Sequence, residues 1–316
     1  MERLKKRFGK GPTGFGKGLK KRWAEKAEKT GQGGQMTGGA ANASCRIIDA
    51  HIHFCCGDDY FDLIAGEAGH QNTREHLERQ FKDQNVACGV VMGNRGLEME
   101  KHQYPEFLRY CIGLDSSYLF QNQVADAVDQ VEAHLQRDQC AGVKLYPGYS
   151  PFYVTDPIYE PVFELAEKYG KAVAVHTGAT AGSGAILKYS HPLTLDEVAV
   201  RHPYVQLVMC HFGSPWLMDA AAVVDKNDNV AADLSGLLEG RVNLDVFFEE
   251  KAGFLEQLRA WLGYLDQYDR IMYGTDWPLA NLEEYQLFIR RLVPEKFHQK
   301  VFFDNANRVY KLGLDV

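Results

Sequence analysis

The stretch from Ala141 to His176 shows the pattern that decides the fold. It reads Ala141-Gly-Val-Lys-Leu145, then a turn-rich segment, then Ile158-Tyr-Glu-Pro-Val-Phe-Glu-Leu-Ala-Glu-Lys-Tyr169, then Ala172-Val-Ala-Val-His176. The two short runs have the length and the near-continuous hydrophobicity of strands that are buried on both faces of a sheet. The segment between them has the spacing of an amphipathic helix. This order predicts two parallel strands joined by a crossover helix.

The same alternation extends along the chain in both directions. Eight apolar runs are predicted to be strands: Arg46–Ala50, Val86–Met92, Arg109–Leu114, Ala141–Leu145, Ala172–His176, Val205–Cys210, Val230–Leu234 and Arg270–Tyr273. The amphipathic segments predict helices at Thr73–Gln84, Gln121–Arg137, Ile158–Tyr169, Leu195–Arg201, Pro215–Val224, Leu244–Leu265, Leu282–Arg291 and Asn305–Leu312. Eight such units in about 270 residues favour a closed (β/α)8 TIM barrel over an open doubly wound sheet. No glycine-rich nucleotide-binding loop follows any of these strands.

Residues 1–44 differ in composition from the rest of the chain. Segment 1–29 carries eleven Lys and Arg against three Glu, and residues 1–44 hold ten of the thirty glycines. Such a segment lacks the apolar surface that would offset the entropy lost on ordering. We therefore predict a disordered, basic, glycine-rich tail at 1–44 and one barrel domain at 45–316.

Composition and charge limit the class of protein. The 316 residues are 45% hydrophobic, which allows a large core, and no apolar run reaches the ~18 residues of a transmembrane helix. Beyond residue 29 the net charge is −15, which is unlike a nucleic-acid-binding surface. The seven cysteines are odd in number and most lie inside apolar runs, and no secretory signal is evident, so we expect reduced thiols in the cytoplasm. No CxxC pair is present that would indicate a thiolate zinc site. A homo-oligomer is compatible with the sequence.

Polar side chains stand where the predicted strands end. His51 and His53 end the first strand and, at positions i and i+2, are expected to point to the same side. His176 ends the fifth strand, His211 the sixth and Asp276 the eighth. In a (β/α)8 barrel these ends meet at the mouth, where catalytic residues lie. Burial of four imidazoles and a carboxylate without partners is costly, and a shared divalent ion removes that cost. The sequence therefore predicts a metal site.

The remaining histidines are given no ligand role. His76 and His134 lie in charge-rich helical stretches and are predicted to be solvated. His202 precedes the sixth strand and belongs at the bottom of the barrel, and the loop residues His70 and His191 stay unassigned.

As a set, the motifs resemble the amidohydrolase superfamily. The motifs are Asp49-Ala-His-Ile-His53, His176-Thr-Gly178, His211-Phe-Gly213 and Gly274-Thr-Asp-Trp-Pro278. With the closing segment Asn305-Ala-Asn-Arg-Val-Tyr310, the chain is most similar to the amidohydrolase-related branch that includes aminocarboxymuconate-semialdehyde decarboxylase. The resemblance covers residues 46–312. It implies a metal-dependent enzyme that acts on a small molecule.

The resemblance also assigns a role to each residue. It implies that His51, His53, His176 and Asp276 hold a divalent ion, for which zinc is the first candidate. Asp276 and His211 are the implied catalytic residues: Asp276 moves a proton, and His211 polarises the substrate or transfers protons.

Lys144 leaves the number of ions open. Lys144 stands in Gly142-Val-Lys-Leu-Tyr-Pro-Gly148 at the end of the fourth strand. In binuclear members of the superfamily, a lysine at this place is carbamylated and bridges two ions. Members of the narrower branch often carry a similar segment and use one ion, and Lys144 would then be an ammonium that holds a substrate carboxylate or forms a structural ion pair. We expect one ion.

Residues at the mouth are predicted to contact the substrate. Lys144 and Arg95 are the expected partners of a substrate carboxylate, because cations pair with anionic oxygen. Tyr146 and Trp277 are expected to contact it as aromatic residues. Other loop residues are expected to shape the pocket: Asp115, Tyr149, Phe152, Trp216, Asp233 and Ser235.

Two reactions fit this set of residues. The first expectation is a hydrolase that activates water for attack on a small carboxylated or cyclic ester or amide. The alternative is a metal-dependent, non-oxidative decarboxylase of the same family. A non-catalytic binding barrel is a third hypothesis, which predicts missing ligands, and none is missing.

Overall fold

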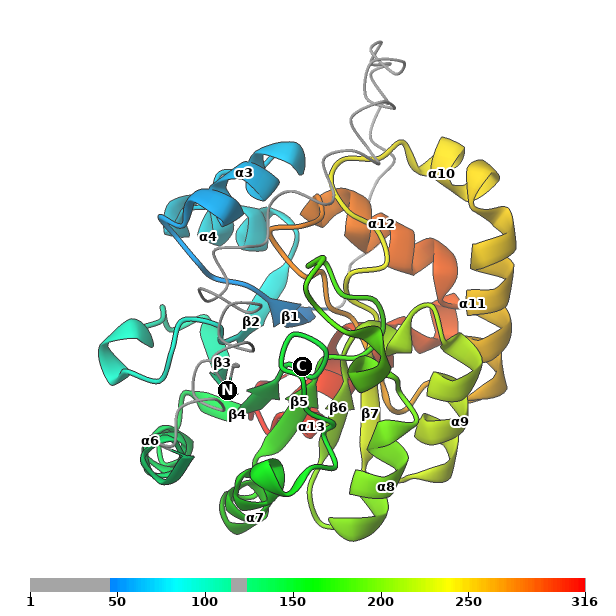
Figure 1. Cartoon of the computed structure of the whole chain (residues 1–316). Helices are drawn as coiled ribbons and strands as arrows, with labels where there is room; N and C mark the ends of the chain where they lie inside the picture. The colour runs from blue at the N-terminus through cyan, green and yellow to red at the C-terminus, as the bar shows by residue number, and fades with distance from the viewer. Residues whose placement is uncertain (1–45, 115–123, 316) are drawn as a thin grey trace.

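Eight strands form a single sheet in the order β1 to β8 in the computed structural model, which describes residues 46–114 and 124–315 (Figure 1). The strands are β1 (Ile47–Ile52), β2 (Val86–Met92), β3 (Leu108–Leu114), β4 (Cys140–Leu145), β5 (Ala172–Val175), β6 (Leu207–Met209), β7 (Val230–Asp233) and β8 (Ile271–Met272). Every neighbouring pair along this order is parallel. The predicted (β/α)8 barrel is confirmed. The predicted tail at 1–44 and the loop residue Asp115 lie outside the described residues.

Helices surround the barrel (Figure 1). They are α3 (Asp59–Glu67), α4 (Arg74–Asp83), α6 (Val124–Leu135), α7 (Glu160–Tyr169), α8 (Thr194–Arg201), α9 (Leu217–Lys226), α10 (Leu244–Glu250), α11 (Ala252–Tyr264), α12 (Leu282–Leu292) and α13 (Asn305–Val309). Short 3-10 turns are η3 (Met99–Lys101), η4 (Pro157–Tyr159), η5 (Leu187–Ser190), η6 (Cys210–Gly213) and η7 (Glu295–Phe297), and a π-turn, η8 (Lys300–Asp304), precedes α13.

Two helical segments differ from the sequence expectation. Helix α3 was not predicted; Asp58 caps it by accepting hydrogen bonds from the backbone nitrogens of Tyr60 and Phe61 at 3.0 and 3.2 Å. The single helix predicted at Leu244–Leu265 is divided into α10 and α11, because Lys251 leaves the helical conformation (φ −106°, ψ 17°).

The barrel closes between β8 and β1 through backbone hydrogen bonds. The nitrogen of Ala50 donates to the oxygen of Tyr273 at 3.0 Å, that of His53 to Trp277 at 2.6 Å, and that of Asp276 to His51 at 2.8 Å. The register of β1 against β2 also shifts between Asp49 and Ile52, an irregularity of the kind that re-aims side chains beside active sites. Closure therefore fixes Asp276 next to His51, in β1, and His53, directly after it.

Two hydrophobic clusters explain why the strands read as continuously apolar. The larger cluster joins strand residues to the surrounding helices, for example Val173 to Phe163. The smaller cluster contains Ile48, Val90 and Val208 on other strand positions and continues to α13 through Tyr310. The strands thus pack on both faces, as expected of a parallel barrel.

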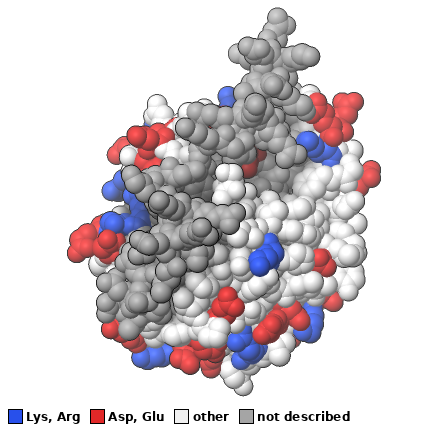
Figure 2. All heavy atoms as spheres, viewed as in Figure 1, with Lys and Arg blue, Asp and Glu red and all other residues white. Residues whose placement is uncertain are grey.

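The exposed surface carries charges of both signs. On the face drawn in Figure 2, Lys and Arg side chains are separated by Asp and Glu and by uncharged surface, without a continuous basic stripe over the described part of the chain. Among residues 46–114 and 124–315, no helix has the length and hydrophobicity needed to cross a bilayer.

Candidate metal centre

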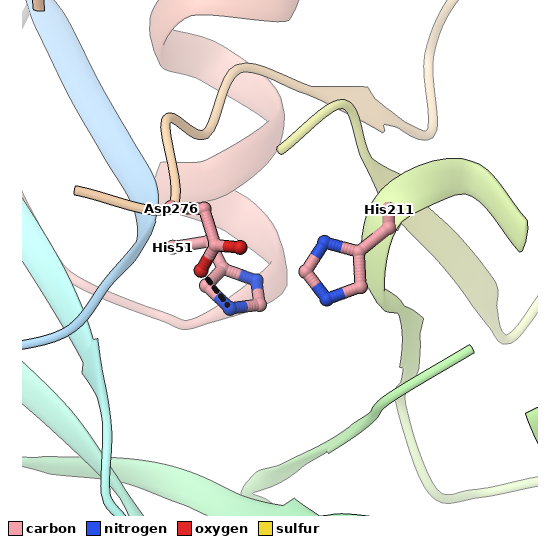
Figure 3. A group of neighbouring side chains, drawn as sticks. All are labelled: His51, His211 and Asp276. Carbon is pink, nitrogen blue, oxygen red and sulfur yellow. Dashed lines mark ion pairs between the residues drawn. The ribbon is translucent and has the colours of Figure 1, made fainter. Parts of the chain in front are cut away.

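Side chains from several strand ends meet at the barrel mouth. Figure 3 shows His51 of β1, His211 of η6 and Asp276, which follows β8, pointing toward one another. One nitrogen or oxygen atom of each of the three lies within 4.8 Å of the others. His53 and His176 join the same group through Asp276 and His211, respectively. The structure thus brings together all five residues that the sequence predicted for the site.

Asp276 contacts His51 of β1 and His53, the residue after β1, with one oxygen. Its Oδ1 lies 3.3 Å from Nε2 of His51 and 3.1 Å from Nε2 of His53. Ligand atoms about 2.1 Å from a common ion are separated by roughly 3.0–3.4 Å, so these spacings suit a shared divalent cation. Within the described residues, the Nε2 of His51 and the Oδ1 of Asp276 are buried and have no hydrogen-bond partner.

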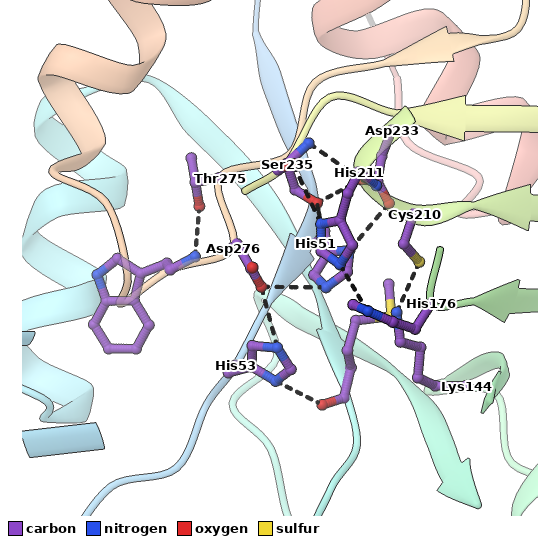
Figure 4. Close-up of polar contacts among 12 residues, drawn as sticks. His51, His53, Lys144, His176, Cys210, His211, Asp233, Ser235, Thr275 and Asp276 are labelled. Atoms are coloured by element: carbon purple, nitrogen blue, oxygen red, sulfur yellow. Dashed lines mark hydrogen bonds and ion pairs between the residues drawn. The ribbon is translucent and has the colours of Figure 1, made fainter. Parts of the chain in front are cut away.

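The outward nitrogens of the same two histidines face acceptors. Nδ1 of His51 lies 3.0 Å from Oδ2 of Asp233, and Nδ1 of His53 lies 3.2 Å from the carbonyl oxygen of Met92 (Figure 4). A carboxylate or carbonyl oxygen can only accept, so each neutral ring carries its proton on Nδ1. Each Nε2 therefore presents a lone pair toward Asp276. Histidine ligands of metals are commonly held in this way.

The rings of His176 and His211 are also held by hydrogen bonds to backbone carbonyl oxygens. Nε2 of His176 lies 3.1 Å from the carbonyl oxygen of Ala179, and Nδ1 of His211 lies 3.2 Å from that of Ser235. Both of these nitrogens must donate. The remaining nitrogens, Nδ1 of His176 and Nε2 of His211, then meet at 3.1 Å as two lone pairs. Two facing acceptors repel each other unless a cation or a proton lies near both.

The protonation states agree with the hydrogen-bond pattern. Burial lowers the pKa of His51, His176 and His211, that of His211 to about 4, so these rings are neutral at pH 7. Burial opposes ionisation of Asp276, but His51, His53 and His211 outweigh it and hold the pKa of this carboxyl well below its usual range. Neutral imidazoles and an ionised carboxylate are the forms that bind metal ions.

Backbone strain is concentrated at two of the five residues. His211 and Asp276 have φ angles of 64° and 62°, in the left-handed region that non-glycine residues rarely adopt. Strain of this kind costs about 1–3 kcal/mol per residue and gathers at functional sites. Both residues were predicted from the sequence to be catalytic.

Gly236 keeps space between these two side chains. Its φ is +65°, and a Cβ there would lie 3.0 Å from Nδ1 of His211 and 3.2 Å from Oδ2 of Asp276. The sequence analysis did not identify this residue, although it follows Asp233-Leu-Ser235 directly. It matters because the backbone approaches both side chains closely.

Asp49, a further buried carboxylate, links β1 to the segment that follows β8. Asp49 accepts hydrogen bonds from the backbone nitrogen of Thr275 at 3.0 Å and from its hydroxyl at 2.6 Å. Burial raises the pKa of Asp49 to about 7. This contact ties the strand that carries His51 to the segment that carries Asp276. Asp49 belongs to the Asp-Ala-His-Ile-His motif, which was the only sequence signal for it.

Lys144 lies beside these five residues, but its side-chain hydrogen bond goes to Cys210 and not to any of them. Its side chain is 1% exposed, and Nζ donates to Sγ of Cys210 at 2.7 Å. Nζ also lies 5.3 Å from the centre of the Tyr146 ring, while the Tyr146 hydroxyl donates to the carbonyl oxygen of Gly93 at 2.7 Å. The ammonium is thus held at the inner wall of the barrel.

The other predicted substrate contacts occupy different places. Arg95 donates from Nη2 to the carbonyl oxygen of Cys56 at 3.2 Å, in the loop that follows β1. Trp277 is fully buried, and its ring lies beside that of His70 with centroids 6.2 Å apart.

Two aromatic rings border His53 and His176, two of the candidate ligands. The ring of Phe61, on α3, lies 5.6 Å from that of His53, and the ring of Tyr149 lies 4.9 Å from that of His176. Phe61 was missed because α3 was not predicted. These rings give the site an aromatic wall.

A separate hollow of about 570 Å³ opens near the loop after β1. None of the five converging residues lines it, so it is distinct from the metal centre. Its lining includes Phe54, Cys56, Asn72, Arg74 and Tyr104.

Comparison with known proteins identifies relatives of the fold. A family model with the description Amidohydrolase matches residues 48–312. No curated protein matches the sequence.

Several solved structures share the architecture at low sequence identity. One is 5-carboxyvanillate decarboxylase LigW from Sphingomonas paucimobilis, with 15% identity, a TM-score of 0.56, and coverage of 85% of this chain and 99% of that one. A second is a dihydroxybenzoic acid decarboxylase from Polaromonas sp. JS666 with bound manganese and 2-nitroresorcinol, with 13% identity, a TM-score of 0.59, and coverage of 86% and 98%. A third is a probable 2-pyrone-4,6-dicarboxylic acid hydrolase from Acinetobacter baumannii with bound citric acid, with 15% identity, a TM-score of 0.56, and coverage of 85% and 99%. At these identities the likeness shows the fold.

Proposed function

Since the chain belongs to the amidohydrolase family, we propose that it is a metal-dependent decarboxylase that releases carbon dioxide from a small carboxylic acid without oxidation. The observation that carries the proposal is the set of inward-facing lone pairs on His51, His53, His176, His211 and Asp276, which have no donor among them. The kind of reaction is supported by the structural relatives, because two of the three described above are decarboxylases.

Support for one divalent ion comes from the short distances of Nε2 of His51 and Nε2 of His53 to the same oxygen of Asp276. His176 reaches this group through His211, which itself lies within 4.8 Å of His51 and Asp276. We propose that His51, His53, His176 and Asp276 hold it, with zinc as the first candidate and manganese, which one structural relative contains, as the second. When bound, such an ion supplies a Lewis acid that neutralises carboxylate charge on the substrate. Lys144 supports the choice of one ion, because its Nζ would have to leave Cys210 before it could bridge two.

His211 and Asp276 are the proposed proton carriers. Decarboxylation breaks the bond between a carbon and its carboxyl group, leaves the electron pair on that carbon, and requires a proton there. Nε2 of His211 carries no proton in the resting protein, so it first takes one up from solvent and then donates it to this carbon as carbon dioxide leaves. Oδ2 of Asp276, which like Nδ1 of His211 lies close to Gly236, can relay this proton. A positioned acid of this kind contributes about 10²–10⁴ in rate.

The surrounding side chains suit a planar, anionic substrate. Phe61 and Tyr149 place aromatic rings next to the ligands His53 and His176, and rings of this kind pack against flat unsaturated molecules. Lys144 is the proposed partner for substrate carboxylate charge, because it is a buried cation beside the centre. We propose an aromatic or other unsaturated carboxylic acid as the substrate.

Hydrolysis, the first expectation from the sequence, stays as the second candidate. The observation in its favour is the similarity to the probable 2-pyrone-4,6-dicarboxylic acid hydrolase. His211 and Asp276 would then accept a proton from water and not donate one to carbon.

We also propose a cytoplasmic location, supported by the free thiols of all six cysteines in the described part of the chain.

A substrate screen separates the two reactions. The metal-loaded full chain is incubated with 2,6-dihydroxybenzoate, with 5-carboxyvanillate and with 2-pyrone-4,6-dicarboxylate, and carbon dioxide release and ring opening are followed in parallel. We expect carbon dioxide from at least one benzoate, and none from a variant that carries His51→Ala and His53→Ala. Ring opening of the pyrone without any release of carbon dioxide would favour the hydrolase.

A further inference from the structure

We infer that Asp233 is the positioning residue that sets the proton position of His51 and, through the Ser235 hydroxyl and together with the Ser235 carbonyl oxygen, supports that of His211, so that the inner nitrogens of both rings carry lone pairs. The inference rests on the proposed metal centre for its purpose, but the contacts that carry it are independent of any ion. Asp233 ends β7, between the strand that carries His51 and the turn that carries His211 (Figure 4).

Asp233 is fully buried and accepts hydrogen bonds with both oxygens. Oδ2 faces Nδ1 of His51 at 3.0 Å. Oδ1 accepts from the backbone nitrogen of His211 at 3.0 Å, from the backbone nitrogen of Ser235 at 3.2 Å, and from the Ser235 hydroxyl at 2.5 Å. The three donors at Oδ1 favour the ionised form of this carboxyl, because hydrogen bonds to a carboxylate stabilise its charge. The group therefore acts only as an acceptor.

Ser235 extends this control to the ring of His211. A hydroxyl has one hydrogen, and that of Ser235 is directed to Asp233. The Ser235 oxygen must then accept from Nδ1 of His211, which lies 2.9 Å away. The carbonyl oxygen of Ser235 accepts from the same nitrogen at 3.2 Å. The proton of His211 is thus held on Nδ1, and Nε2 is left bare toward His176.

Asparagine at position 233 should reverse the proton position on His51. The amide has one acceptor oxygen and one donor nitrogen at almost the same size as the carboxylate. Oδ1 faces three donors, which are the backbone nitrogens of His211 and Ser235 and the Ser235 hydroxyl, whereas Oδ2 faces only Nδ1 of His51. The amide oxygen will take the side with three donors, so its nitrogen faces His51. His51 must then accept on Nδ1 and carry its proton on Nε2, where a metal ion would bind.

Asp49→Asn is the matched control. Asp49 is as fully buried as Asp233, and it also lies next to His51, accepting from its backbone nitrogen at 3.3 Å. Its other partners are the nitrogen and hydroxyl of Thr275. None of its hydrogen bonds involves the ring of His51. The control therefore removes a buried carboxylate from the same strand region without a direct effect on the tautomer.

The experiment reads the tautomer and the metal affinity separately. Full-length chains with ¹⁵N-labelled histidine are prepared metal-free, and the ring nitrogens of His51 are assigned by NMR in the wild type, Asp233→Asn and Asp49→Asn. The same proteins are titrated with Zn²⁺ and with Mn²⁺. We expect the proton of His51 on Nδ1 in the wild type and in Asp49→Asn, and on Nε2 in Asp233→Asn. The Kd of Asp233→Asn for metal should rise by about 10–100-fold.

The wild type keeps the inference testable if Asp233→Asn does not fold, because the inference requires the proton on Nδ1 of both His51 and His211. Ser235→Ala removes the hydroxyl that links Asp233 to His211 but keeps the carbonyl oxygen of residue 235, so it should leave both protons on Nδ1.

Three results would overturn the inference: a His51 proton on Nε2 in the wild type, an unchanged His51 proton in Asp233→Asn, or an equal change in Asp49→Asn. Failure of the wild type to bind either ion would refute the metal centre and leave the tautomer result to decide the role of Asp233.

Discussion

Replacement of Gly236 by alanine should lower kcat clearly, whereas its effect on Tm should match that of an alanine at any comparable left-handed glycine. The Cβ of the new residue would lie 3.0 Å from Nδ1 of His211 and 3.2 Å from Oδ2 of Asp276. Ordinary contacts of carbon are about 3.5–4.0 Å, so one or both side chains must move by about 0.5 Å. The substitution therefore displaces the two proposed proton carriers directly.

The expected changes in Tm and in kcat of Gly236→Ala have separate causes. Alanine at a left-handed position costs roughly 1–2 kcal/mol of backbone strain, which for a domain of this size lowers Tm by about 2–8 °C. Misplacement of a catalytic group by 1 Å can cost about 10²-fold in rate, so a shift of half that distance should lower kcat by about tenfold.

Gly240→Ala separates the two effects. Gly240 has a φ of +68°, close to that of Gly236, but the nearest atom to its added Cβ is the carbonyl oxygen of Glu67 at 3.7 Å. It should share the loss of Tm and keep nearly the wild-type kcat. The assay is steady-state turnover on the best substrate of the screen, with thermal unfolding measured in parallel. Equal kcat values for the two variants would refute the reasoning.

Three further predictions concern single side chains. Asp276→Asn should lower kcat by about 10²–10⁴-fold, because an amide oxygen cannot accept a proton at neutral pH. It should lose less metal than the histidine variants, because the amide oxygen can still face an ion; steady-state kinetics and metal analysis check both effects. Lys144→Met should leave the metal content unchanged and raise mainly KM, since the proposal gives Lys144 a contact with substrate charge; release of an ion would indicate a two-ion centre. Burial, and then His76 beside it, lower the pKa of His70 to about 4, whereas an unfolded histidine titrates near ~6.5. The unfolded chain binds the extra proton between these values, so the metal-free protein should lose stability as pH falls from about 6.5 toward 4, and His70→Asn should show a smaller fall in Tm over this range.

Local sequence signals were sufficient to predict the barrel and the five polar side chains that meet at its mouth. Each strand is a short apolar run, and His51, His53, His176, His211 and Asp276 follow such runs directly, so their placement at the strand ends needs no long-range information. The resemblance then supplied the roles that are proposed for these residues.

Contacts between distant segments were beyond the reach of the sequence. The prediction that His134 is solvated is wrong: it is fully buried, with Nδ1 2.9 Å from the Tyr110 hydroxyl and Nε2 2.8 Å from the carbonyl oxygen of Leu97. His76, also predicted to be solvated, is 8% exposed and pairs with His70. A charge-rich helix pattern shows which face is polar on average, but not which polar residue a neighbouring loop covers.

The proton positions in the site depend on such distant contacts too. Asp233 and His51 are separated by 182 positions in the sequence, and Asp233 was expected only to shape the pocket. Its hydrogen bonds to His51 and to the backbone nitrogen of His211 form only when β7 lies beside β6 and β8 and β1 closes the barrel. Tautomers therefore follow from the fold and not from any motif.

The metal content of the folded chain tests the central claim most directly. Full-length wild type and the double variant with His51→Ala and His53→Ala are exposed to Zn²⁺ and Mn²⁺, freed of excess ions, and analysed for bound metal by mass spectrometry. We predict about one ion per chain in the wild type, as expected for a site with three imidazoles and one carboxylate, and almost none in the folded double variant. A folded wild type without bound metal, or a double variant that keeps the full content, would contradict the claim that these side chains form a metal centre.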